Sequence, residues 1–348
     1  MLETELLQVS LGIRRCLSRT YTDGEWDRCL VFADKQAILG VLWAGIEVLP
    51  KEQSPYKDLL MEWMGQTERL QTRSDEMNRA CTRVYHNFKS AGFESVILKG
   101  QSNAKLYGGK LLRTPGDIDI WLFAPRDLIC RYLRENVPSY SGEHEGKLHT
   151  EFHWRDVTLE VHFTATYLTV PKYDRRLSVW LEAQSRELKT LGSKLTDGFP
   201  SPTLEFNLVY LILHMYRHYL FEGIGLRHVV DYYLVLQKST AMQRRAAFDV
   251  LQNLGAERFA AALMWVLAEG FDLNAEIWLC QPDTWRGRML WNAIMDGGNF
   301  GKADKMNSEE YRRWGWKRLW RFVKRNVSMF AAYPNEIGWH ILGRVFCF

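Results

Sequence analysis

Two aspartates separated by one residue, Asp117 and Asp119, are well suited to metal chemistry. They lie in the segment 116–123 (GDIDIWLF), where charged and apolar residues alternate before an apolar end, as in a strand that reaches a site. Side chains two apart on a strand project from the same face, roughly 7 Å apart. Two such carboxylates repel each other unless a cation lies between them, and a divalent ion with oxygen ligands meets that need. Taken alone, the pair is equally typical of a strand end that faces solvent.

A third carboxylate, Glu160, favours the metal interpretation. It stands between Leu159 and Val161 in another alternating segment, and His162 falls on its own face. If this strand neighbours the segment 116–123, three carboxylates gather in one place, as in a two-metal site. The alternative is a glutamate on the solvated face of a hairpin.

Lys99 and Gly100 are the last two residues of the segment 95–100, whose short apolar run predicts a buried strand. A glycine at this point lets backbone amides approach a phosphate, and the turn after it offers a helix N-terminus to an anion. Lys99 and Arg113 are suited to neutralising a triphosphate. The segment is not a P-loop, because the pattern G-x-x-x-x-G-K-[ST] is absent.

The elements around these residues predict an α+β fold that is mostly helical. A small mixed sheet is expected from the strands at 95–100 and 116–123 and from a hairpin over 147–163 with its turn near Arg155. Helical periodicity dominates before this core and again after Pro202. We therefore predict three regions: an N-terminal helical region (1–92), the sheet-containing core (93–200) and a C-terminal helical region with a basic aromatic tail (201–348).

Composition narrows the class of protein. The 348 residues are 47% hydrophobic and 25% charged, as in an ordinary globular protein, and the net charge is only +4. This modest charge argues against a binder of long nucleic acid. Six scattered cysteines make no C-x-x-C pair, and neither a signal peptide nor an apolar run long enough to span a membrane is visible, so we predict a cytoplasmic protein.

The motifs, taken in order, resemble the uncharacterised nucleotidyltransferase family of the polymerase-β-type superfamily. That superfamily is marked by a glycine turn, a D-x-D pair on the next strand and a third acidic residue on a later strand. The resemblance covers most of residues 95–340 and rests on these motifs: L-K-G (98–100), Ala104, Tyr107, Arg113, G-D-I-D (116–119), L-E-V-H-F (159–163), H-x-x-x-H (214–218), G-L-R (225–227), Asp231 and Y-P-N-E (333–336).

The resemblance implies a reaction and a set of roles. The enzyme would move a nucleoside monophosphate from a nucleoside triphosphate, with ATP as the first candidate, to a hydroxyl acceptor and release pyrophosphate. Two Mg2+ ions, or Mn2+ in their place, would be bound by Asp117 and Asp119, while Glu160 would complete one site and help to deprotonate the acceptor. The remaining roles are phosphate binding by Lys99, Gly100, Ser102 and Arg113, and an acceptor pocket bordered by His162, His218, Arg227 and Asp231.

The helical pairs in the C-terminal region have simpler interpretations as well. His214 and His218 lie one helical turn apart, so they either bind zinc or are hydrogen-bonded core histidines, and the second is favoured because no third ligand is evident. Arg227 and Asp231 have the same spacing and predict an ion pair within one helix.

The segment 312–330 combines an aromatic stripe, which includes Trp316 and Trp320, with five basic residues that mostly lie elsewhere around the helix. Such a helix either packs its stripe on the domain, which is the favoured interpretation, or lies on an anionic membrane or an acidic partner.

Three functions therefore stay open at this stage. The first is nucleotidyl transfer to an acceptor that is a small molecule, a sugar, a peptide or a protein. The second is a module of the same fold that binds a nucleotide or ligand without turnover, and the third is peripheral membrane binding through 312–330.

Overall fold

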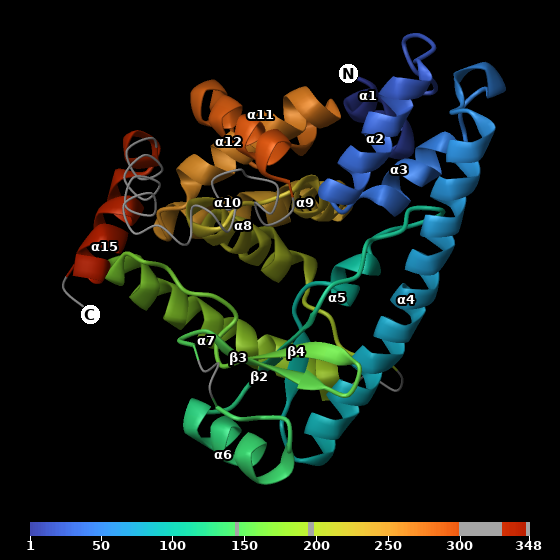
Figure 1. The fold of residues 1–348 in the computed structure, drawn as a ribbon. Helices are drawn as coiled ribbons and strands as arrows, with labels where there is room; N and C mark the ends of the chain where they lie inside the picture. The colour runs from blue at the N-terminus through green and yellow to red at the C-terminus, as the bar shows by residue number, and fades with distance from the viewer. Residues whose placement is uncertain (143–145, 194–197, 299–328, 346–348) are drawn as a thin grey trace.

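The computed structural model describes residues 1–142, 146–193, 198–298 and 329–345. These residues form helices around a single four-stranded sheet, which confirms the predicted α+β class (Figure 1). Most of the predicted basic aromatic segment, 312–330, lies outside the described residues. No helix in the described ranges is long and apolar enough to cross a membrane.

The N-terminal region is helical as predicted, and its apolar segment 33–49 is divided between two helices. The helical conformation is interrupted at Ala37, which has a φ of +55°. The helices of this region are α1 (Leu2–Ser10), α2 (Asp23–Lys35), α3 (Leu39–Ile46), the 3-10 turn η1 (Lys51–Gln53) and α4 (Lys57–Ser90).

Helix α4 is one continuous helix of 34 residues. It runs along one side of the molecule, past the N-terminal helices and past the sheet (Figure 1). Its apolar face is buried against the sheet, with Met77, Val84 and Phe88 in the same hydrophobic cluster as Ile120 and Val161. One element thus connects the N-terminal helices to the sheet.

The sheet has the order β1-β2-β4-β3. Strand β1 (Ser95–Ile97) is antiparallel to β2 (Ile118–Leu122), which is parallel to β4 (Val157–His162). Strand β3 (His149–Trp154) pairs antiparallel with β4, and Arg155 between them has a φ of +55°. The predicted hairpin and its turn near Arg155 are therefore confirmed, as is the mixed character of the sheet.

Three helices surround the sheet: α5 (Gln101–Ala104), α6 (Arg126–Asn136) and α7 (Pro171–Ser193). Helix α6 buries Ile129 and Leu133 in the same cluster as the strands. Helix α7 has no counterpart among the predicted elements. It buries Leu177, Leu181 and Leu188 among largely exposed charged residues.

The described residues of the C-terminal region are mostly helical, as predicted, and the chain turns between two of these helices at Gly255, which has a φ of +71°. Its helices contribute to the same apolar cluster as α1–α3, with Leu6 and Leu42 joined by Leu263. They are α8 (Leu204–Phe221), α9 (Leu226–Lys238), α10 (Ala241–Asn253), α11 (Glu257–Phe271), the turn η2 (Ala275–Ile277), α12 (Thr284–Gly297) and α15 (Pro334–Val345).

Candidate active site

The register of the sheet brings the three predicted carboxylates together. Parallel pairing of β2 with β4 places Asp119 directly beside Glu160, and Asp117 immediately precedes β2. One carboxylate oxygen from each residue lies within 4.8 Å of the other two. Asp119 is only 1% exposed, and its Oδ2 atom has no hydrogen-bond partner among the described residues.

Lys99 is the nearest cation to these carboxylates. It follows β1 by two residues, and its Nζ lies 2.9 Å from Asp119 Oδ1. Burial opposes the positive charge, but Asp119 and the neighbouring Asp117 outweigh it and raise the pKa of Lys99 above its ordinary value. Lys99 is therefore a firmly charged partner of the carboxylate cluster.

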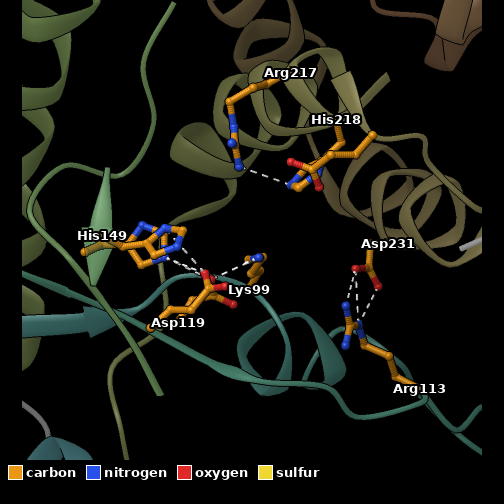
Figure 2. Close-up of polar contacts among 10 residues, drawn as sticks. Lys99, Arg113, Asp119, His149, Arg217, His218 and Asp231 are labelled. Atoms are coloured by element: carbon orange, nitrogen blue, oxygen red, sulfur yellow. Dashed lines mark hydrogen bonds and ion pairs between the residues drawn. The ribbon is translucent and has the colours of Figure 1, made fainter. Parts of the chain in front are cut away.

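Two histidines also lie against the carboxylates. His162 Nε2 lies 3.0 Å from Asp119 Oδ1 and 3.3 Å from Glu160 Oε2. Burial opposes protonation of His162, but its hydrogen bonds to both carboxylates raise the pKa of the ring. His149 Nδ1 lies 3.7 Å from Glu160 Oε2, and burial lowers the pKa of that ring. Figure 2 shows the His149 ring on one side of the Asp119 carboxylate and Lys99 on the other.

His149 is absent from the predicted site, although the sequence held a signal for it. A two-residue turn at Arg155 and Asp156 fixes the hairpin register, and that register pairs His149 with His162. Side chains directly opposite each other in a sheet share a face. The residue that joins the cluster could therefore have been found by pairing positions across the predicted turn.

Glu160 is held in its ionised form. Burial alone would raise the pKa of its carboxyl group, but the hydrogen bond from His162 and the charge of Lys99 outweigh burial and lower the pKa to about 2. A carboxylate with so low a pKa is a weak proton acceptor at neutral pH. It is well suited to holding a cation.

The predicted phosphate-binding residues divide into two pairs. Lys99 and Gly100 border a small gap beside Asp117 and Asp119. Gly100 has a φ of +61°, and a Cβ there would meet the Asp117 carbonyl oxygen at 3.4 Å, so glycine suits this turn.

Arg113 borders the same gap, but it and Ser102, the other two predicted phosphate ligands, are engaged by groups of the protein. The Ser102 hydroxyl donates to the Ile97 carbonyl at 2.6 Å. Arg113 donates from Nε to Asp231 Oδ1 and from Nη2 to Asp231 Oδ2, both at 2.8 Å. Helix α5 has only four residues, so the turn does not open a long helix toward an anion.

Asp231 is the centre of a separate buried cluster. Besides Arg113, it accepts hydrogen bonds from the Tyr107 hydroxyl at 2.7 Å and from Asn103 Nδ2 at 3.1 Å. Figure 2 shows the Arg113–Asp231 pair apart from the contacts around Asp119. These bonds connect α9 to the turn after β1 and to the segment before β2, and the pairing of Asp231 with Arg227 stays a prediction.

The histidines of the C-terminal region lie close together. The rings of His214 and His218 are 4.3 Å apart, and burial lowers the pKa of both. His218 contacts Glu222 at 2.7 Å and Arg217 at 3.2 Å (Figure 2). Within the described ranges, neither His214 nor His218 belongs to a group of three or more metal-binding side chains, so these histidines are better described as neutral, buried residues beside the site.

Two cavities meet at Asp117. A cavity of about 840 Å³ lies between α4, the loop before β2 and the β3–β4 turn, and its lining includes Arg73, Arg79 and Arg83 of α4. A gap of about 20 Å³ lies deeper, beside Lys99 and Asp119 and below His214 and His228.

Arg227 lines both cavities. Its Nη1 donates to the Thr114 carbonyl at 3.3 Å. Burial, and then the charge of Arg113, lower the pKa of Arg227 to about 10, so the guanidinium stays charged at neutral pH. Of the four residues predicted to border an acceptor pocket, Arg227 is the one that faces both the large cavity and the carboxylates.

The fold and this arrangement of side chains agree with what the motifs imply, and comparison with known protein families identifies the family of this protein. The family described as uncharacterised nucleotidyltransferase matches residues 22–272. The match spans well over half of the chain, so the protein belongs to that family. It begins before residue 95 and ends before the Y-P-N-E motif at 333–336, so it includes α2–α4 and excludes that motif. A search of curated proteins found no match.

Proposed function

We propose that this protein transfers a nucleoside monophosphate group from a nucleoside triphosphate to a hydroxyl acceptor and releases pyrophosphate. The observation that carries the proposal is the gathering of Asp117, Asp119 and Glu160 from adjacent strands around one point, beside a buried lysine. Membership of a nucleotidyltransferase family supports a nucleotide as the substrate. We assign the chemistry to the region 93–200, with the helical regions 1–92 and 201–348 around it.

The carboxylate cluster fits a divalent cation of the Mg2+ type. Its donors are all carboxylate oxygens, which this ion prefers, and Asp119 Oδ2 is buried and without a partner among the described residues. Asp117, Asp119 and Glu160 would hold Mg2+, or Mn2+ in its place. When bound, the metal would neutralise charge that develops on the transferred phosphoryl group and on the leaving pyrophosphate.

The cationic side chains that face the carboxylates are the best candidates to bind the triphosphate. Lys99 and the Gly100 turn keep their predicted roles, because both border the gap at Asp117 and Asp119. Arg113 is committed to Asp231, so we assign the second cationic role to Arg227, which faces both cavities. A charged guanidinium binds phosphate oxygens with directed hydrogen bonds.

The reaction forms a bond between the acceptor oxygen and the α-phosphorus and breaks the bond from the α-phosphorus to the bridging oxygen of pyrophosphate. The sequence implied that Glu160 helps to remove the acceptor proton. Glu160 Oε2 is engaged by His162 Nε2 at 3.3 Å, so we propose that the proton leaves the acceptor oxygen to water.

The large cavity has the size of an ordinary small-molecule site. Its arginines suit an anionic ligand such as the triphosphate, although Glu76 and Asp156 also line it. We keep Arg227 as an acceptor-pocket residue. His162, His218 and Asp231 have the protein contacts described above and would act on the acceptor through their neighbours.

The test uses purified protein with Mg2+, α-labelled nucleoside triphosphates and cell extract as a source of acceptors. We expect label to move to a new species with the wild type and with the surface control Asp249→Asn, and not with Asp119→Asn. Metal-dependent nucleotide binding without transfer would overturn the enzymatic proposal in favour of a binding module. If the protein neither binds the nucleotide nor transfers the label, the metal site itself is rejected.

A further inference from the structure

A second group of possible metal ligands shares Glu160 with the carboxylate cluster: His149, Glu160 and His162 each place one ligand atom within 4.8 Å of the others. We propose that these three side chains form a binding site for a first-row transition ion of the Zn2+ or Co2+ type. This site adjoins the proposed Mg2+ site, shares Glu160 with it and differs from it in having two imidazole ligands. It rests on side-chain geometry and does not depend on nucleotidyl transfer.

The sheet builds this group directly. Antiparallel pairing of β3 with β4 places His149 opposite His162, and Glu160 lies two residues before His162 on the same strand. Residues directly opposite and residues two apart share one face of a sheet. The three side chains therefore project from the same face of two paired strands of six residues each.

The distances between the donor atoms fit one ion. Ligand atoms about 2.1 Å from a metal are separated by about 3.0 Å in an octahedral site and about 3.4 Å in a tetrahedral one. Here Glu160 Oε2 lies 3.3 Å from His162 Nε2 and 3.7 Å from His149 Nδ1. A shift of a few tenths of an ångström by the His149 ring brings its Nδ1 into this range from Glu160 Oε2, and the ligand atoms of the two histidines lie within 4.8 Å of each other.

The donor types select the ion. Two imidazole nitrogens with one carboxylate favour zinc, cobalt, iron or nickel over Mg2+, whereas three carboxylates favour Mg2+ or Mn2+. Asp119 Oδ1 lies 3.0 Å from His162 Nε2, and the same carboxylate has a buried Oδ2 without a partner among the described residues. Asp119 can therefore contribute one oxygen to the Mg2+ ligands and one to the ligands of the transition ion.

The site also has a route of entry. The His149 side chain is 26% exposed, while those of His162 and Asp119 are 3% and 1% exposed. An ion can thus arrive from solvent at His149 and be enclosed by the other ligands. Lys99, which contacts Asp119 Oδ1, lies on the side of Asp119 away from His149 (Figure 2).

The experiment uses the full chain, stripped of metal with a chelator and titrated with Co2+ at pH 8, with visible absorption as the readout. We expect one Co2+ to bind in the wild type and Zn2+ to displace it. His149→Ala should weaken Co2+ binding by at least roughly tenfold to a hundredfold, because loss of a group that only orients a metal ligand already has an effect of that size. The matched control is His153→Ala, which removes another histidine of β3, about 13 Å along the strand.

A second measurement needs no variant. X-ray absorption of the Zn2+-loaded wild type should show scattering from two imidazole rings. Scattering from oxygen ligands alone, or Co2+ affinity unchanged in His149→Ala, would overturn the proposal. Asp117→Asn separates the two sites, because it should abolish Mg2+-dependent transfer while Co2+ still binds. Imidazole-bound Co2+ with no transfer under any condition would uphold this inference and reject the proposed reaction.

Discussion

Two buried charged clusters border the small gap beside Gly100, and they differ in how completely their charges are matched. Asp231 is surrounded by Arg113, Tyr107 and Asn103, which together satisfy both of its oxygens. In the other cluster, three carboxylates share Lys99 and the ring of His162, and Asp119 Oδ2 has no partner among the described residues. A matched cluster connects elements of the scaffold, whereas a cluster with excess negative charge is a place for an added cation.

Replacing a carboxylate of the unmatched cluster should have the largest effect on activity. For Asp119→Asn we expect nucleotidyl transfer to fall by about a thousandfold, which corresponds to about 4 kcal/mol of transition-state stabilisation. The rate of label transfer under saturating Mg2+ measures this. Asp249→Asn, an exposed aspartate on α10, should retain the wild-type rate. Equal rates for Asp119→Asn and the wild type would remove the cluster from the chemistry.

Breaking the matched cluster should reduce stability instead. For Asp231→Ala we expect the free energy of unfolding to fall by about 3–5 kcal/mol, because the buried Arg113 guanidinium loses its counter-charge. Urea denaturation followed by circular dichroism measures the change. The control Asp249→Ala should change it by less than about 0.5 kcal/mol. A loss as small as that of the control would show that Asp231 is not a scaffold residue.

A cation should stabilise the unmatched cluster. At Mg2+ concentrations about tenfold above its dissociation constant, we expect the free energy of unfolding of the wild type to rise by about 1.4 kcal/mol. Thermal unfolding with and without a chelator measures the rise, and Asp117→Asn should lose most of it. A gain of the same size in that variant would place the ion elsewhere.

An effect of similar size is expected at Arg227, which lines both cavities. Arg227→Gln should raise the KM for the nucleoside triphosphate by roughly tenfold, since one charged hydrogen bond to a phosphate contributes about 1.5 kcal/mol. Initial rates at varied nucleotide concentration measure it, with Arg245→Gln, an exposed arginine of α10, as the control. An unchanged KM for Arg227→Gln would show that other cationic side chains bind the phosphates.

Local patterns predicted much of the fold and part of the candidate site. Alternation along 116–123 and 147–163 predicted the strands, and their adjacency gathered the carboxylates as expected. The partner of Arg113 could not be predicted in this way, because Asp231 is 118 residues away and meets it only through the packing of α9. Helix α7 was missed because its few buried leucines are scattered among charged residues.

The most direct test of nucleotidyl transfer compares the fates of two labels. The wild-type protein is incubated with Mg2+, acceptor-containing extract and either an α-labelled or a γ-labelled nucleoside triphosphate. Transfer of a nucleoside monophosphate predicts that the α label enters a new species while the γ label is recovered in pyrophosphate, and that both changes disappear in Asp119→Asn. Movement of the γ label to the acceptor, or retention of both labels in the triphosphate, would contradict the account.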